Sequence, residues 1–361
     1  MSYLLAFLGI AALVILHEAG HFVAAKAVGM RVERFSLFFG PMLVKFRRGE
    51  TEYGIGPIPL GGYVKITGMN PHEELAPELV PRAYYNQPAW KRIVVILAGP
   101  AVNLLIAFVV LMGIFWSEGT VVTTHGQPVF RVEALVPPAS QHLKSGDQIV
   151  AVDGRRELSA DQITSQIASH RCAGPQAAGC SASKPVNLLV RRGGKALTFT
   201  IYPRYAPAQK RARVGFNLQA LIRPIGPGEA TSQSVSQMWY VTTATVTRIA
   251  KLFDSKERKQ LHGIVGGFKI TQQSFAFSTT QALATLALIS LSLAVINLFP
   301  FLPLDGGHVF WAVAEKLRGR RVSFALMERV GVVGFVLIVL LGVIGLSNDI
   351  STLSGGGFKV R

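Results

Sequence analysis

Four long apolar segments constrain this chain more than any other feature of its sequence. They cover residues 4–28, 93–116, 282–304 and 330–346, and a membrane-spanning helix needs about 20 mostly apolar residues. Half of the 361 residues are apolar, 16% are charged and the mean hydropathy is +0.37, which is too apolar for an ordinary soluble domain. The sequence therefore predicts a polytopic α-helical membrane protein with about four transmembrane helices.

Basic residues in the short connections predict how these helices are oriented. Nine Lys and Arg residues fall in 29–92 and four in 305–325, whereas residues 1–10 contain none. Because short basic connections stay in the cytoplasm, we expect the N-terminus, residues 118–280 and the C-terminal tail on the opposite side. A cleaved signal peptide is the alternative for the first segment, but its positively charged n-region is missing.

The formal net charge of +17 raises the question of a nucleic-acid partner. The basic residues are dispersed and no nucleic-acid motif accompanies them, so we expect no nucleic-acid binding and assign the charge to contact with an anionic lipid bilayer. The chain has two cysteines, Cys172 and Cys180, too few for a disulfide scaffold or a cysteine zinc cluster. They lie eight residues apart in the predicted extracytoplasmic region, where a disulfide between them is expected.

The long connection between the second and third segments contains its own domain. Residues 142–163 hold the string L-x-x-G-D-x-I-x-x-V-D-G, which resembles a PDZ domain; another small β domain is the alternative. Strands at 185–192 and 196–203, joined by Gly193-Gly194, form a predicted hairpin. The sequence thus predicts an inserted extracytoplasmic α+β PDZ domain, a fold that binds peptides by strand addition.

The chain divides into four predicted parts. They are an N-terminal membrane half, the PDZ domain, a linker with an amphipathic segment, and a C-terminal membrane half, at residues 1–126, 127–204, 205–280 and 281–361. Within the third part, residues 231–262 carry Trp239, Tyr240 and a basic end. This composition favours an interfacial helix; a plain linker helix fits equally well.

The first apolar segment contains the pattern His-Glu-x-x-His. His17 and His21 share one face of a helix, and Glu18 lies about 100° around it. Two such histidines bind zinc in hydrolases that use the Glu as general base. A metzincin would continue with Gly and a third His, but Ala24 and Ala27 occupy these positions. The alternative is structural: two histidines at a helix end with a Glu that reaches the interface.

A third zinc ligand must come from elsewhere in the chain. The stretch 296–308, INLFPFLPLDGGH, ends an apolar segment with Pro300 and Pro303 and continues with Asp305 and His308. Irregular backbone and an acid at membrane depth are tolerated when protein or water surrounds them. Asp305 comes first after the apolar segment and is the favoured ligand, whereas His308 remains an alternative.

A Gly- and Pro-rich run in the first basic connection predicts a membrane-associated β-hairpin loop. Residues 53–67 are too short for a spanning helix, and polar and apolar side chains alternate from Tyr63 onward. We expect an exposed strand edge at Gly62, Tyr63, Val64 and Lys65, to which a substrate strand could add. An ordinary cytoplasmic hairpin is the alternative.

These motifs together resemble the site-2 protease family of intramembrane zinc metalloproteases, in its bacterial branch with a single PDZ domain. HEAGH at 17–21, GGYVKITGM at 61–69, GPAVN at 99–103 and LDGG at 304–307 carry the resemblance, which covers nearly the whole chain. The segment 261–267, LHGIVGG, departs from the family pattern because it lacks a proline.

The resemblance implies a function and a set of roles. One zinc ion per chain would be held by His17, His21 and Asp305, with Glu18 as base and Asn297 in substrate or oxyanion contact; a helix–helix hydrogen bond is the alternative for Asn297. Substrates would be single-pass membrane proteins, such as anti-sigma factors or signal-peptide remnants, cut within their transmembrane segments in a bacterial inner membrane. The PDZ domain would restrict their access.

Two other functions fit parts of the sequence. A membrane zincin with a soluble active site would take its third ligand from a cytoplasmic helix, where Glu73, Glu74 and Glu78 are available. A PDZ-bearing membrane adaptor without catalysis would have no need for His17, Glu18 and His21 together. Metal content distinguishes the adaptor from both enzymes, and an Asp305 variant distinguishes the enzymes.

Overall fold

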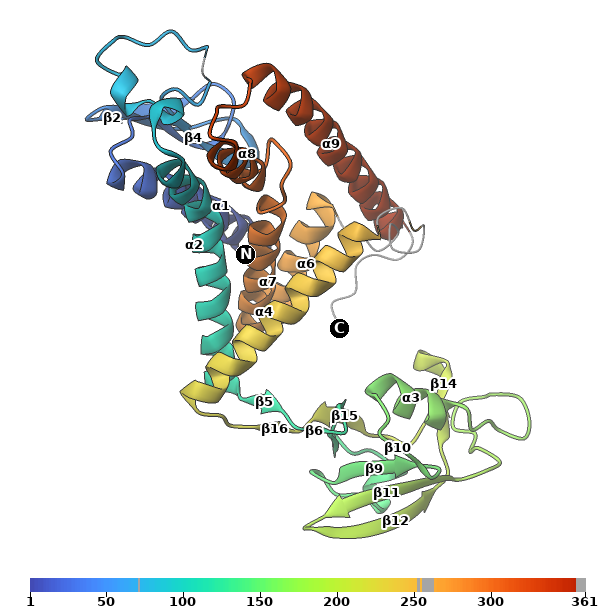
Figure 1. Ribbon diagram of the computed structural model, residues 1–361. Helices are drawn as coiled ribbons and strands as arrows, with labels where there is room; N and C mark the ends of the chain where they lie inside the picture. Colours follow the sequence, from blue (N-terminus) through green and yellow to red (C-terminus); the bar gives the residue numbers. More distant parts are fainter. Residues whose placement is uncertain (71, 252–253, 255–262, 355–361) are drawn as a thin grey trace. The chain divides into compact units, whose positions relative to one another are not determined.

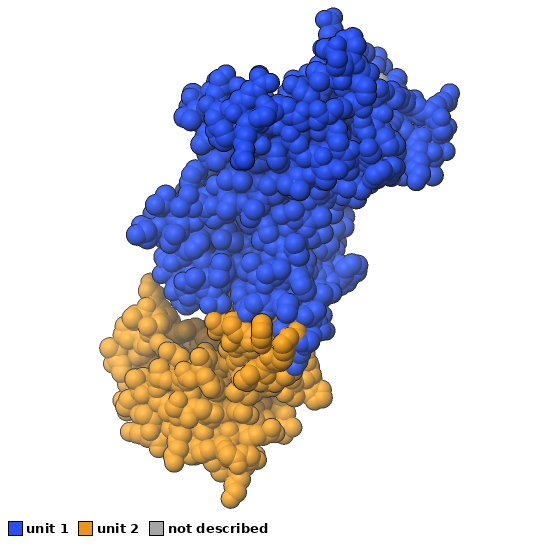
Figure 2. All heavy atoms as spheres, turned by 90° about the vertical axis from the view of Figure 1, so that its left-hand side faces the viewer, with its two compact units in different colours: residues 1–114, 228–361 blue, residues 115–227 orange. Residues whose placement is uncertain are grey.

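A computed structural model describes residues 1–70, 72–251, 254 and 263–354. The chain forms two compact units: residues 1–114 together with 228–361, and residues 115–227 (Figures 1 and 2). Each unit has its own core, and the first contains all the residues to which zinc chemistry was assigned.

Four helices in the described residues are long and apolar enough to cross a membrane, which confirms the prediction. They are α1 (Ser2–Ala27), α2 (Ala89–Glu118), α7 (Thr279–Asn297) and α9 (Phe324–Ser354) (Figure 1). Helix α7 ends earlier than its apolar segment, because the prolines at 300 and 303 favour a loop over residues 298–304. Helix α9 is longer than the predicted segment 330–346.

Among the described residues, the first unit has three further α-helices: α4 (Pro227–Ala250), α6 (Ile264–Phe277) and α8 (Asp305–Arg318). Helix α4 covers much of the predicted amphipathic segment, and its residues Trp239 and Tyr240 are 70% and 68% exposed. An interfacial position for α4 stays a prediction. Most of the basic end of that segment, and the start of LHGIVGG, lie outside the described residues.

The first basic connection folds into more than a hairpin. Strands β1 (Val32–Phe39), β2 (Val44–Arg48), β3 (Thr51–Ile55) and β4 (Ile58–Ile66) form a sheet in the order β2-β3-β1-β4. Strand β1 pairs in parallel with β3 and antiparallel with β4, so β4 is an edge strand. Two 3₁₀ turns, Val80–Arg82 and Tyr84–Asn86, lead from the sheet to α2.

The sheet packs against the helices through a small apolar core. Met30, Val32 and Ile66 are buried together with Val95 and Ile96 of α2. This contact joins the first strand, the edge strand and the second membrane helix. It holds β4 beside α1, which carries the His-Glu-x-x-His pattern.

The second unit is a β unit with one helix. Its strands and its helix are, in chain order, β5 (Thr120–Val121), β6 (Thr123–Thr124), β7 (Gln127–Pro128), β8 (Phe130–Glu133), β9 (Gln148–Val152), β10 (Arg155–Arg156), α3 (Ala160–Ala168), β11 (Val186–Arg192), β12 (Lys195–Ile201), β13 (Arg204–Ala206), β14 (Arg211–Arg213), β15 (Asn217–Ala220) and β16 (Ile222–Arg223). The main sheet has the strand order β12-β11-β9-β8-β15, with β10 paired to β9. Two 3₁₀ turns, Ala139–Gln141 and Pro207–Gln209, connect them.

Local sequence signals explain several parts of this unit. The predicted hairpin is present: β11 pairs with β12 across Gly193-Gly194, where both glycines have positive φ. A capping box between Ser159 and Gln162 begins α3. Cys172 and Cys180 form the expected disulfide.

The β unit extends beyond the predicted domain boundaries of 127 and 204. Strand β15 lies after residue 204 and pairs with β8, so the main sheet needs both ends of the unit. The compact unit accordingly covers residues 115–227.

Candidate metal centre

Three side chains from two distant parts of the chain meet in the first unit. The Nε2 atoms of His17 and His21 are 3.3 Å apart, and Oδ2 of Asp305 lies 3.3 Å from the first and 3.4 Å from the second. Ligand atoms about 2.0–2.1 Å from a tetrahedral zinc ion are about 3.3–3.4 Å from each other. The triangle of nitrogen and oxygen atoms therefore has the size that a zinc ion requires.

The chemistry of the three groups also fits zinc. Two imidazoles and a carboxylate are common zinc ligands, and three protein ligands leave a fourth position for water in catalytic sites. Oδ2 of Asp305 is buried and has no hydrogen-bond partner besides the two imidazoles, and burying a carboxylate oxygen is costly unless it is paired. Among the described residues, these three form the group of His, Cys, Asp and Glu side chains suited to hold a metal.

Close helix packing places the two histidines against α2. A Cβ at Gly20 would overlap the carbonyl of Ala98, and a Cβ at Gly99 would overlap the imidazoles of His21 and His17. The first glycine belongs to HEAGH and the second to GPAVN. Both motifs therefore need glycine because the helix backbone and the imidazoles occupy the space of a side chain.

Hydrogen bonds from α2 orient both imidazoles. Nδ1 of His21 lies 2.9 Å from the carbonyl oxygen of Val95 and donates to it, which leaves Nε2 free for a metal. Nδ1 of His17 lies 3.1 Å from Nδ2 of Asn103, a fully buried residue. For Nε2 of His17 to bind zinc, Nδ1 must carry the proton, so the amide of Asn103 must be turned over to present Oδ1, a buried acceptor that has no hydrogen-bond partner as placed.

Asn103 is a site residue that the sequence reasoning missed. GPAVN contributed to the family resemblance, but no role was assigned to its Asn. A single polar residue within the apolar segment 93–116 was the available signal.

Asp305 is brought to the histidines by the start of α8. A Cβ at Gly306 would overlap the backbone of Leu298 and Phe299, and one at Gly307 would overlap the backbone of Leu302. The two glycines thus let α8 begin directly on the loop that follows α7. Burial by itself would raise the pKa of Asp305, but the adjacent His17 and His21 imidazoles lower it to about 2.

His308, the alternative ligand, does not join the metal group. It lies one turn after Asp305 on α8, and burial lowers the pKa of its imidazole below the usual value. The geometry therefore favours Asp305 over His308 as the third ligand.

Glu18 lies between the histidines and the edge strand β4. Its carboxylate lies near the backbone of Val64. A Cβ at Gly62 would approach Cγ of Glu18 at 3.0 Å, which is tighter than an ordinary contact. Gly62 therefore allows β4 to pass close to this carboxylate.

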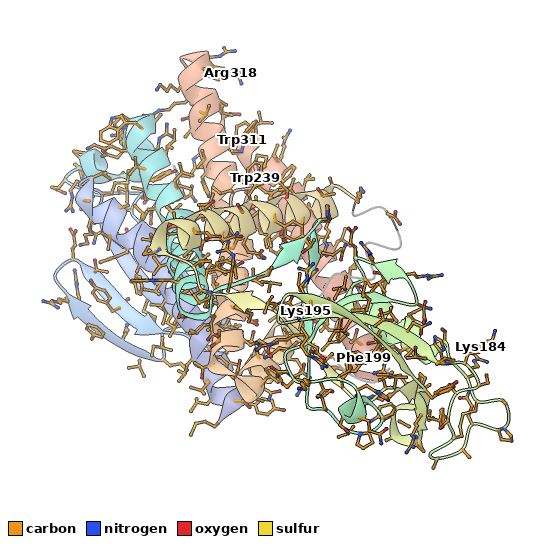
Figure 3. All side chains as sticks on the ribbon, turned by 90° about the horizontal axis from the view of Figure 1, so that it is seen from below. Lys184, Lys195, Phe199, Trp239, Trp311 and Arg318 are labelled. Atoms are coloured by element: carbon orange, nitrogen blue, oxygen red, sulfur yellow. A yellow bond between two sulfur atoms is a disulfide. The ribbon has the colours of Figure 1, made fainter. Side chains whose placement is uncertain are left out.

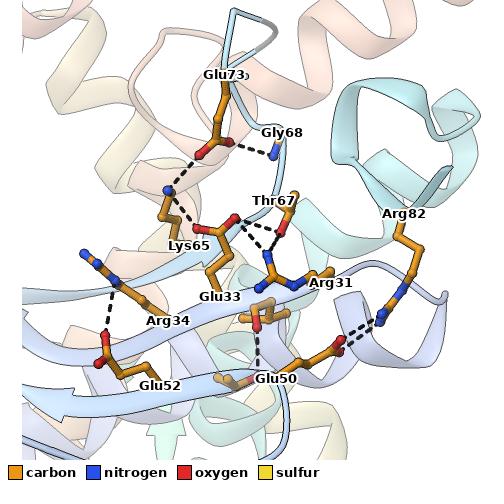
Figure 4. A network of polar contacts seen from close by, with 12 residues as sticks. Arg31, Glu33, Arg34, Glu50, Glu52, Lys65, Thr67, Gly68, Glu73 and Arg82 are labelled. Atoms are coloured by element: carbon orange, nitrogen blue, oxygen red, sulfur yellow. Dashed lines mark hydrogen bonds and ion pairs between the residues drawn. The ribbon is translucent and has the colours of Figure 1, made fainter. Parts of the chain in front are cut away.

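Two of the four predicted edge residues have side chains that contact other residues of the first basic connection. Nζ of Lys65 lies 2.8 Å from a carboxylate oxygen of Glu33 and 2.8 Å from one of Glu73, as Figure 4 shows. The ring of Tyr63 stacks on that of Phe39 with centroids 6.0 Å apart. What β4 can offer another strand is its backbone.

The same network removes one of the alternative ligands. Glu73 is bound by Lys65 and by the backbone N–H of Gly68 (Figure 4), and it is not part of the metal group. Glu74 and Glu78 are also outside that group. Asn297, the last residue of α7, does reach the centre, with Nδ2 3.3 Å from Nε2 of His17.

A His-Glu-x-x-His helix with a converging aspartate, set among apolar helices, defines a membrane-bound metallohydrolase. The chain belongs to peptidase family M50, whose sequence profile it matches over residues 5–341. This agrees with the resemblance to site-2 proteases that the motifs indicated. The chain is thus a zinc-dependent metalloendopeptidase and a multi-pass membrane protein.

Relatives match the chain over almost its full length. A protein of Nostoc sp. with a provisional zinc metalloprotease name is 31% identical, with 98% of this chain and 97% of the relative covered. A similarly named protein of Clostridium acetobutylicum is 27% identical, with 97% of each chain covered. Zinc metalloprotease Rip1 of Mycobacterium tuberculosis is 29% identical, with 92% of this chain and 91% of Rip1 covered.

Proposed function

We propose that this protein is an intramembrane endopeptidase that cuts transmembrane segments of single-pass membrane proteins, with zinc held by His17, His21 and Asp305. One observation carries the proposal: the ligand triangle is built from α1, which is long and apolar enough to cross a membrane, and from Asp305, which begins α8 directly after the loop that follows a second such helix. Peptide bonds buried in lipid are the substrates that such a position can reach.

The chain's own residues supply the proton transfers. Zinc, when bound, activates a water molecule and polarises the scissile carbonyl. Glu18, next to His17 in sequence, accepts the proton of that water and returns it to the leaving amine. Asn297 has its amide beside His17 and donates to the oxyanion that develops on the carbonyl. Asn103 and the Val95 carbonyl keep the two imidazoles oriented.

The edge of β4 would hold the substrate in an extended form. A helical substrate hides its carbonyls in hydrogen bonds and must unwind locally before it is cut. Residues 62–65 offer backbone groups beside Glu18, and the side chains of Tyr63 and Lys65 are engaged internally. Binding by backbone pairing would accept many sequences, which suits a protease of membrane segments.

Access and biological role follow from the family resemblance. We assign the β unit as an extracytoplasmic PDZ domain that restricts substrates with bulky ectodomains, and we place the protein in a bacterial inner membrane with its N- and C-termini outside the cytoplasm. Anti-sigma factors and signal-peptide remnants are the substrate types we expect. This implies a role in regulated intramembrane proteolysis.

The catalytic part of the proposal is tested with purified protein in lipid vesicles. A single-pass peptide substrate is added and the cleavage site is read by mass spectrometry. Glu18→Gln should keep its zinc but abolish cleavage, whereas the exposed control Glu74→Gln should leave cleavage unchanged. Cleavage by zinc-loaded Glu18→Gln would refute the general-base role, and a cut outside the apolar segment would refute intramembrane cleavage.

The role of the β unit needs a separate deletion. Residues 119–226 should be replaced by a short linker, because a cut at 204 would leave β15 without its partner β8. The shortened protease should then cleave a substrate with an untrimmed ectodomain that the full chain rejects. Unchanged selectivity in a deletion variant that still binds zinc would refute restriction by this unit.

A further inference from the structure

Helix α8 exposes an apolar face and buries a charged side chain, which is the reverse of an ordinary surface helix. Its outward face carries Leu317, Phe310 and Val313, which are 82%, 50% and 40% exposed. Its inward face carries Glu315, whose side chain is only 10% exposed and pairs with Arg92 of α2 at 2.6 Å. An apolar patch that faces outward, with an ion pair on the inside, is expected where the surroundings are not water alone.

The position of α8 in the chain restricts what those surroundings are. The helix has 14 residues and so is about 21 Å long, too short to cross a hydrocarbon core of about 30 Å. It follows α7 after residues 298–304 and precedes α9 after residues 319–323, and both neighbours can span a membrane. Such short connections keep α8 close to a membrane surface.

Basic side chains flank the apolar face. Lys316 and Arg318 lie about 100° to either side of Leu317 on the helix, and Arg320 lies two residues beyond its last residue. All three are exposed, and within the described chain none of them forms an ion pair with an acidic group. Figure 3 labels Trp311 and Arg318 on this helix, with Arg318 as its last residue.

We propose that α8 is an interfacial anchor that binds anionic phospholipids. The face formed by Phe310, Val313 and Leu317 enters the boundary between headgroups and acyl chains. Lys316, Arg318 and Arg320 extend their charged ends to the headgroup phosphates, each strengthening binding about fivefold. The charges select an anionic membrane surface over a second protein chain, because a protein partner would have to supply matching acids.

The anchor acts on the metal centre through the start of the helix. Asp305 is the first residue of α8, and Glu315 ties the other end to α2 through Arg92. A fixed depth of α8 in the interface therefore helps to fix the depth of the carboxylate relative to the two histidines. Lipid contact by α8 does not require that peptides are cut within the membrane.

The test uses a fluorescent probe on the full-length chain. Leu317→Cys is labelled with an environment-sensitive dye, since Cys172 and Cys180 are joined and do not compete. Glu78→Cys, an exposed position between the sheet and α2, is the matched control. Each labelled protein is reconstituted in phosphatidylcholine vesicles, with and without phosphatidylglycerol, and quenched from the acyl region by spin-labelled lipid or from water by iodide.

Lipid quenching of the Leu317 probe should be strong and should increase with phosphatidylglycerol, whereas the Glu78 probe should respond mainly to iodide. Replacing Lys316, Arg318 and Arg320 together by Gln should remove the phosphatidylglycerol dependence and shift docking about fivefold per lost charge. Equal quenching of both probes by lipid, or no effect of phosphatidylglycerol on the native sequence, would overturn the proposal. A Leu317 probe shielded from both quenchers would mean a protein partner and would also overturn it.

Discussion

Replacing Asn103 by Ala should weaken zinc binding without disturbing the helix packing around it. The side chain is fully buried in α2, and its Nδ2 atom lies 3.1 Å from Nδ1 of His17, so that with the amide turned over Oδ1 accepts from that nitrogen. Ser290 of α7 donates to the backbone carbonyl of Asn103, so this interhelical bond survives the substitution. What is lost is the group that fixes the tautomer and the orientation of His17.

The expected size of the effect follows from that single hydrogen bond. Removing the hydrogen-bond partner of a ligating histidine lowers metal affinity about 10- to 100-fold, or about 1.4–2.7 kcal/mol. Zinc affinity is measured by competition with a chromogenic chelator on the purified protein. Asn103→Asp is the matched control, because a carboxylate can only accept a hydrogen bond and should preserve affinity.

Two results would refute this reasoning. Unchanged zinc affinity in folded Asn103→Ala would mean that the amide does not support His17. An affinity of Asn103→Asp as low as that of Asn103→Ala would mean that Nδ1 is not the protonated nitrogen, and the assignment of Nε2 to the metal would fail.

Three further predictions concern the framework of the site. Gly99→Val should abolish zinc binding in a protein that still folds, because the new side chain would occupy the space of the His21 imidazole; a normal zinc content would contradict the packing. Asp349→Ala should lower the free energy of unfolding by about 2–4 kcal/mol in a denaturant titration, since its buried carboxylate accepts from the backbone N–H of residues 263 and 266 at 3.1 and 2.7 Å; an unchanged midpoint would show that these bonds are not needed. Hydrogen bonds from Arg82 lower the pKa of Glu50 to about 2, so their stabilisation is complete above about pH 4.5 and is lost as the pH falls toward 2. Glu50→Gln should therefore make the melting temperature less dependent on pH in this acidic range. An unaltered pH profile would argue against stabilisation by the Arg82–Glu50 pair.

Local sequence patterns predicted the parts of the site that depend on spacing. The interval between His17 and His21 places both on one helix face whatever surrounds them. The prolines at 300 and 303 and the following glycines marked the loop that directly precedes Asp305, the first residue of α8. The alternation after Gly62 predicted a strand, and the apolar lengths predicted the membrane helices.

Those local patterns did not predict contacts between distant segments. The parallel pairing of β1 with β3 turned an expected hairpin into a four-stranded sheet, and no local signal specifies such a partner. The β unit likewise closes only when β15 returns to β8. Asn103 appeared as one polar residue in an apolar segment, and its role became visible once His17 lay beside it.

The most direct test of the proposed centre is the zinc content of two single variants. Purified wild-type protein should contain one zinc ion per chain by inductively coupled plasma mass spectrometry. Asp305→Ala should lose most of that metal because it removes one corner of the ligand triangle, whereas His308→Ala should retain it. Retention of zinc by folded Asp305→Ala, or a loss confined to His308→Ala, would contradict the proposed ligand set.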